Sequence, residues 1–107
     1  MKRLIILICY IHAILFADTT ISVDSLFSIG NRYFSIEKYD YALDAYLAIL
    51  EQVEHPDLYY NIGNTYYRLG NLGQAIWAYE KGVQLSPLHK DLQYNLDFVN
   101  ARVKDRI

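Results

Sequence analysis

The stretch from Tyr59 to Pro87, YYNIGNTYYRLGNLGQAIWAYEKGVQLSP, decides the fold of this chain. Apolar and small residues recur at helical spacing in each of its halves: Tyr59, Ile62, Gly63, Tyr66 and Leu69, then Ala75, Ile76, Tyr79, Gly82 and Val83. The segment RLGNLGQ separates the halves, and its two glycines favour the end of one helix and the start of the next. Ser86-Pro87 stops the second helix because proline cannot supply a helical amide. The stretch therefore predicts two antiparallel helices joined by a tight turn.

Small residues within this pattern indicate that the two helices pack closely. We expect the helix axes to approach one another at Gly63 and Ala75, with tyrosine rings filling the space beside them. Gly82 is expected to be small because the first helix of a following unit presses against it. This order of large, small and aromatic residues resembles the tetratricopeptide (TPR) repeat, a helix-turn-helix unit of about 34 residues. The resemblance implies an all-α fold in which such units stack as a solenoid.

Residues 23–55 repeat the pattern at a spacing of 33 residues. The matched pairs are Gly30 with Gly63, Tyr33 with Tyr66, Ala42 with Ala75 and Tyr46 with Tyr79, while Leu26 and Ile29 replace Tyr59 and Ile62. Two departures have expected consequences. Glu37 stands where the second turn has Gly70, so the first turn lacks the conformational freedom of a glycine there. Ile49 stands in place of Gly82 and should hold the next helix further away. Pro56 suits the first position of that next helix.

The segment from Lys90 onward predicts one more amphipathic helix, because apolar residues form a stripe at Leu92, Leu96, Val99 and Val103. Asp97 stands where Gly63 stands in the preceding unit. We therefore expect a TPR domain over 23–107, with repeats at 23–55 and 56–89 and a capping helix at 90–107 that covers the last core face. The alternative is that the chain is a fragment of something longer.

Residues 1–17, MKRLIILICYIHAILFA, have the pattern of a signal peptide. Lys2 and Arg3 form a positive start, an apolar run follows from Leu4 to Phe16, and Ala17 offers a small residue for cleavage. An uncleaved anchor and a lipoprotein modified at Cys9 remain as alternatives. All three predict an exported, periplasmic or envelope-associated protein. Residues 18–22 form a short lead-in, and Ser22 is expected to cap the first helix.

Composition excludes several classes of function. Ten basic residues stand against 12 acidic ones, so nothing favours nucleic-acid binding. Cys9 is the single cysteine, which excludes disulfides and thiolate metal sites from the rest of the chain. His55 and His89 fall between the predicted helices, where capping is a better explanation than catalysis. No phosphate loop, metal-ligand spacing or nucleophile elbow is present, so we expect neither an enzyme nor a cofactor.

The TPR resemblance implies a concave groove lined by the first helix of each unit, where an extended peptide binds. Carrying the groove positions onto this sequence gives the partner-binding set Phe27, Asn31, Tyr60, Asn61, Asn64, Tyr67, Arg68, Tyr94, Asn95, Phe98 and Arg102, with Phe34 at a comparable place. Asparagine amides can pair with a peptide backbone, and aromatic rings supply apolar surface. Arg68 and Arg102 would hold a carboxylate, although the lysines of the family's carboxylate clamp are absent. The alternative is a solvated face whose tyrosines pack on neighbouring helices.

A narrower resemblance rests on the leader, on YNIGNTYYRLG, AIWAYEKG and SP, and on the terminal DLQYNLDFVNARVKDRI. Together these look similar to the BatE-type aerotolerance TPR proteins of bacteria. That resemblance implies a periplasmic assembly factor that works beside von Willebrand-type partner proteins and has no known catalysis.

We therefore expect an exported module that binds a partner polypeptide through its groove, in the assembly of a cell-envelope complex. A membrane contact is expected only through an uncleaved leader. The alternative is a structural unit that self-associates into a longer solenoid or homo-oligomer through apolar edges near Phe27 or Val99. That alternative follows from length, since stable stacks usually need at least about three repeats.

Overall fold

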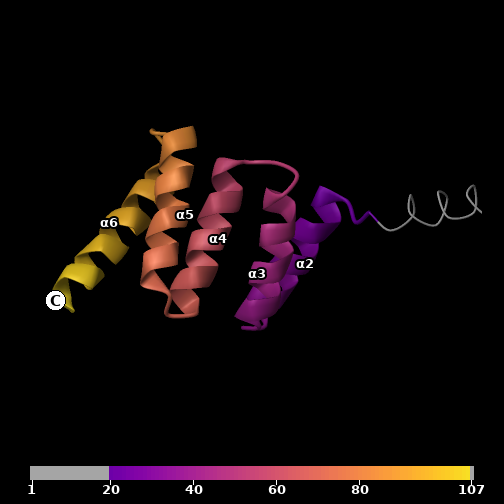
Figure 1. The fold of residues 1–107 in the computed structure, drawn as a ribbon, viewed down its shortest axis with the longest axis horizontal. Helices are drawn as coiled ribbons and strands as arrows, with labels where there is room; N and C mark the ends of the chain where they lie inside the picture. The colour runs from indigo at the N-terminus through magenta and orange to yellow at the C-terminus, as the bar shows by residue number, and fades with distance from the viewer. Residues whose placement is uncertain (1–19, 107) are drawn as a thin grey trace, which may run out of the picture.

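The computed structural model describes residues 20–106, which form five helices and no strand. These are α2 (Val23–Ser35), α3 (Tyr39–Leu50), α4 (Pro56–Arg68), α5 (Leu72–Leu85) and α6 (Lys90–Asp105). Each helix packs on the next one in the chain, so the stack follows chain order (Figure 1). The predicted all-α arrangement of two helical hairpins and a fifth helix is confirmed. The predicted signal peptide at residues 1–17 lies outside the described residues.

Local signals in the sequence account for the helix ends. Ser22 caps α2 by accepting a hydrogen bond from the Ser25 amide at 3.1 Å, as predicted. Pro56 is the first residue of α4, where its missing amide costs nothing, and Ser86 follows the last residue of α5. Gly70 has φ +79° after α4, which is the left-handed conformation that glycine adopts without strain.

Each hairpin is closed by a tyrosine ring lying against a glycine. A Cβ atom on Gly30 would sit 2.5 Å from the Tyr46 ring, and one on Gly63 would clash in the same way with Tyr79. We predicted that Gly63 is small because the helix axes meet there beside Ala75. The Tyr79 ring lies directly against Gly63, as predicted for the tyrosines beside the small residues. The space beside each glycine is thus filled by an aromatic side chain of the partner helix.

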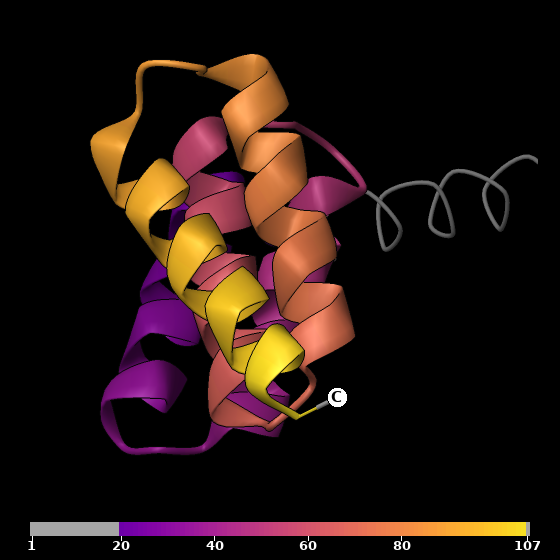
Figure 2. The ribbon, with the colours of Figure 1, turned by 90° about the vertical axis from the view of Figure 1, so that its left-hand side faces the viewer.

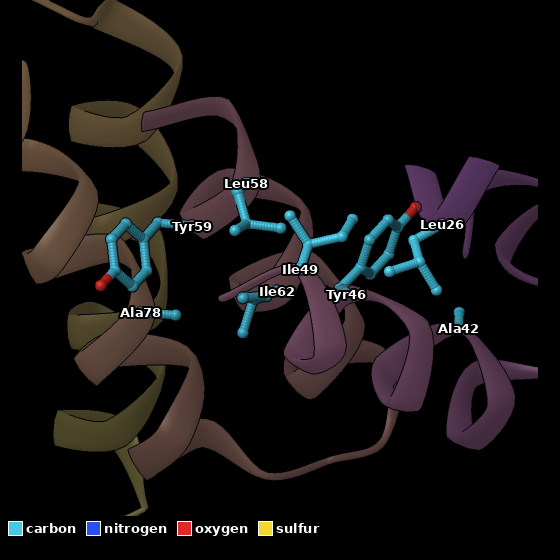
Figure 3. Close-up of a cluster of buried hydrophobic side chains, with 8 residues drawn as sticks. All are labelled: Leu26, Ala42, Tyr46, Ile49, Leu58, Tyr59, Ile62 and Ala78. Atoms are coloured by element: carbon cyan, nitrogen blue, oxygen red, sulfur yellow. The ribbon is translucent and has the colours of Figure 1, made fainter. Parts of the chain in front are cut away.

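The core between the two hairpins is aliphatic (Figure 3). Ile49 of α3 lies against Leu58 and Ile62 of α4, and all three side chains are fully buried. Two apolar residues of the repeat pattern are partly exposed. Ile29, which matches Ile62, and Leu69, at the end of α4, are each 37% exposed. Ile29 is exposed because no described helix covers that side of α2, and Leu69 because it follows the last turn of α4.

Helix α6 covers the last face of the core (Figure 2). Its Leu92 and Val99 side chains are buried, at 0% and 1% exposure, beside Ala75 and Tyr79 of α5. A Cβ atom on Gly82 would lie 2.8 Å from the Leu92 methyl groups, which confirms why that position is small. Val99 itself is therefore no exposed edge, although its neighbour Phe98 is 45% exposed.

Candidate functional site

A hollow near the predicted binding residues lies between α4 and α6. It has a volume of about 390 Å³. Its walls combine aromatic rings, two amides and one guanidinium: Phe34, Tyr60, Asn64, Tyr67, Arg68, Tyr79, Tyr94, Asn95, Phe98 and Val99. None of these described lining residues carries a carboxylate. We call this hollow the aromatic pocket.

A second hollow of about 230 Å³ lies between α2 and α4. It is lined by Asn31, Phe34, Tyr46, Asn61 and Asn64. Phe34 and Asn64 line both hollows, so the two lie next to one another across α2, α4 and α6, and we call them together the groove. The first helix of each unit supplies most of the walls, because the second helices α3 and α5 reach the groove only through Tyr46 and Tyr79.

The floor of the groove is a set of tyrosine–asparagine hydrogen bonds that recurs in both repeats. The Tyr46 hydroxyl donates to Asn31 Oδ1 at 2.5 Å, and the Tyr79 hydroxyl donates to Asn64 Oδ1 at 2.5 Å. Asn95 Nδ2 of α6 also donates to Asn64 Oδ1, at 3.0 Å. Asn64 Oδ1 therefore receives two hydrogen bonds, which leaves the Asn64 side chain only its NH₂ group for a ligand.

Burial changes the acidity of these phenols. It raises the pKa of Tyr46 to about 12 and moves the pKa of Tyr79 upward as well. Both hydroxyls therefore remain protonated donors at neutral pH, and the asparagine oxygens stay occupied. Two of the asparagines that we predicted as peptide-binding groups thus also hold the fold together.

Arg102 lies beside the aromatic rings at the rim. Its Nη1 donates to the Tyr67 hydroxyl at 2.6 Å, and its guanidinium carbon lies 5.6 Å from the Tyr67 ring centroid and 6.0 Å from that of Phe98. The two rings meet edge to face with centroids 6.0 Å apart. Arg102 thus links α6 to α4. Of the two arginines proposed to hold a carboxylate, only Arg68 lines the aromatic pocket.

The structure brings most of the predicted set together along the groove. Nine of its residues line one hollow or the other: Asn31, Tyr60, Asn61, Asn64, Tyr67, Arg68, Tyr94, Asn95 and Phe98. Phe27 does not line either one and packs against the Tyr46 ring, with centroids 6.4 Å apart. Tyr46, Tyr79 and Val99 were missed because their helical spacing predicts core positions. A recurring Asn–Tyr pair 15 residues apart was the available signal for the two tyrosines.

Both histidines of the described chain cap helices, as predicted. His55 Nδ1 accepts from the Asp57 amide at 3.1 Å, and His89 Nδ1 accepts from the Leu92 amide at 3.2 Å. His89 Nε2 also lies 3.2 Å from Asp57 Oδ1, and its ring lies 6.1 Å from that of Tyr60. These contacts place the start of α6 against the start of α4.

No group of three or more His, Cys, Asp or Glu side chains within residues 20–106 is placed to hold a metal ion. No helix in the same range has the length and apolar character needed to cross a membrane.

Comparison with known families agrees with the geometry. The tetratricopeptide repeat family matches residues 56–88, which span α4, α5 and the loop that follows. No curated protein matches the chain. Residues 56–88 are therefore a tetratricopeptide repeat, set in an all-α helical repeat solenoid whose other hairpin has the same glycine–tyrosine contact.

Proposed function

We propose that the groove binds an extended segment of a partner polypeptide. The observation that carries this proposal is that the two hollows lie next to one another across α2, α4 and α6 and share Phe34 and Asn64, so an extended chain could occupy both. TPR repeats are generally non-catalytic units of protein–protein interaction, and a match to that family supports the same function.

The chemistry of the walls suits a peptide. The rings of Tyr94 and Phe98 are 70% and 45% exposed, so apolar side chains of a ligand would remove them from water. The Asn61 side chain and the NH₂ group of Asn64 are free of described side-chain partners and face the second hollow. Amides of this kind satisfy the backbone groups of an extended chain.

The partner is proposed to belong to the cell envelope. Support comes from the leader-like residues 1–17 and from the resemblance of the terminal helix to BatE-type proteins. The envelope proposal is tested by separating cell fractions of the full chain and of a chain lacking residues 1–17. Recovery of both in the same fraction would contradict export.

The binding proposal is tested by capture of a partner from the exported fraction with the tagged protein. Asn61→Ala combined with Arg68→Ala should weaken capture severalfold, because both side chains line the groove without filling the core. The control is Lys81→Ala combined with Gln84→Ala, two exposed residues of α5 that line neither hollow. Equal capture by both variants, with equal melting temperatures, would contradict groove binding.

Self-association has weaker support. Val99 is buried, and the outward positions Ser25 and Arg32 of α2 are polar. The most exposed apolar side chains there are Ile29 of α2, at 37%, and Ile36, which follows the helix, at 54%. Sedimentation at micromolar concentration should therefore give a monomer, and a stable dimer would favour the structural role.

A further inference from the structure

We propose that the segment bound in the groove is acidic, with the carboxylate of an internal Asp or Glu side chain placed against Arg68 in the aromatic pocket. This inference rests on the proposed function and names the chemistry of its partner. It starts from an asymmetry of charge. The chain carries more acidic than basic residues, yet the described lining of this pocket holds a guanidinium and no carboxylate.

The Arg68 side chain has its charge available. It is exposed, it lies in the last turn of α4, and it forms no ion pair with any residue from 20 to 106. Arg102 differs, because its guanidinium is bonded to the Tyr67 hydroxyl and stacked near two rings. A ligand carboxylate in the aromatic pocket would therefore meet the Arg68 guanidinium, which is the one cation of the described lining, and form charge-assisted hydrogen bonds with it.

Hydrogen-bonding capacity points to the same ligand. The Asn64 oxygen is used by Tyr79 and Asn95, so the Asn64 side chain can only donate. Arg68 can only donate as well. Two donor groups on one wall suit carbonyl and carboxylate oxygens, whereas a lysine-rich segment would bring further donors and a repulsive charge.

The shape of the groove favours an internal residue over a chain end. The aromatic pocket shares Phe34 and Asn64 with the neighbouring hollow between α2 and α4, so a chain that occupies both hollows extends beyond the pocket in at least one direction. A terminal carboxylate would need a second cation beside Arg68. The other cation in the predicted set, Arg102, donates to the Tyr67 hydroxyl and does not line the pocket.

The experiment uses three short synthetic peptides with the same alternating leucine residues and with Glu, Gln or Lys between them. All are amidated, and a fourth Glu peptide has a free C-terminus. By fluorescence anisotropy, the Glu peptide should bind the full chain about fivefold more tightly than the Gln peptide, and the Lys peptide most weakly. The free C-terminus should make no difference. The preference for Glu should fall with added salt.

Variants of Arg68 decide the assignment. Arg68→Gln should remove the preference for Glu over Gln, and Arg68→Glu should reverse it in favour of the Lys peptide. Lys81→Gln, on the exposed face of α5, should leave the preference unchanged. Equal binding of the Glu and Gln peptides, a preference that persists in Arg68→Gln, or tighter binding only of the free C-terminus would overturn the acidic-side-chain proposal. In each of those cases groove binding itself would stand, whereas failure of all four peptides to bind would contradict both proposals.

Discussion

The two hairpins have the same architecture, yet equivalent side chains meet different surroundings. Ile62 of α4 is fully buried against α3, whereas Ile29, 33 residues earlier on α2, is 37% exposed. Thr65 is buried and donates its hydroxyl to the Asn61 carbonyl at 2.7 Å, and its counterpart Arg32 is exposed. Position within the repeat sets the direction of a side chain, and the neighbouring helix sets its burial.

The turns of the two hairpins have the same geometry but different residues at the left-handed position. Gly70 and Glu37 occupy equivalent positions, with φ angles of +79° and +63°. The turn geometry is thus the same, but in the first hairpin it is imposed on a residue that has a Cβ atom, and this disfavours the left-handed conformation. The first hairpin therefore stores backbone strain that the second one avoids.

The largest expected effect tests the contact that both hairpins share. Gly63→Leu should prevent folding, because the Tyr79 ring already occupies the space that the new side chain needs. Gly73→Leu is the matched control, since a Cβ atom on that exposed glycine meets nothing within 4 Å. Circular dichroism during heating reports the result, and a cooperative transition in Gly63→Leu near that of the parent would refute the glycine–tyrosine contact.

The next effect tests the difference in burial directly. Ile62→Ala should lower the free energy of unfolding by about 2–5 kcal/mol, because it leaves a cavity between α3 and α4. Ile29→Ala makes the same chemical change at the equivalent, partly exposed site and should cost about 1 kcal/mol. Urea denaturation of both variants measures the gap. Equal losses would mean that α2 is covered in solution by something outside residues 20–106.

A third prediction concerns alkaline pH. Burial raises the folded-state pKa of Tyr46 to about 12, and burial together with a hydrogen bond to Glu54 does the same for Tyr59, against the ordinary value of 10.0. As the pH rises, the unfolded chain therefore releases these protons before the folded chain does. The contribution of the two phenols to the free energy of unfolding is full below pH 10.0 and is lost as the pH rises towards 12. Each fully ionised phenol costs on the order of 2–3 kcal/mol.

Melting temperatures recorded across that pH range check the third prediction. Tyr46→Phe, which cannot ionise, is the control and should show a smaller alkaline loss than the parent. A melting temperature that stays constant up to pH 12 would show that these hydroxyls are accessible to water.

The smallest effect tests the turns. Glu37→Gly should raise the free energy of unfolding by about 1 kcal/mol, since the strained conformation then suits the residue. Gly70→Ala should lower it by a similar amount, which would make the second hairpin resemble the first. Urea denaturation again provides the measurement, and destabilisation by Glu37→Gly would show that the Glu37 side chain contributes contacts that outweigh the strain.

Much of the candidate site was predictable, and the exceptions share one cause. The family pattern placed Asn61, Asn64 and Arg68 on one helix face, and all three line the groove. The pattern did not show that the Asn64 oxygen is already occupied or that Arg102 is engaged with Tyr67. Both hydrogen bonds join α4 to another helix, α5 or α6. Helical spacing predicts which residues share a face of one helix, but it does not predict contacts between helices.

The sequence by itself determined the helices, their ends and the repeat that relates them. Periodicity, N-capping side chains, Pro56 and Gly70 act on neighbouring residues, so their effects can be read without knowing the fold. The packing of the helices against one another was needed to show that Ile62 is buried while Ile29 is partly exposed, and that Arg68 is the one cation among the described residues that line the aromatic pocket. The physical reason is that burial and charge pairing are settled by atoms from distant parts of the chain.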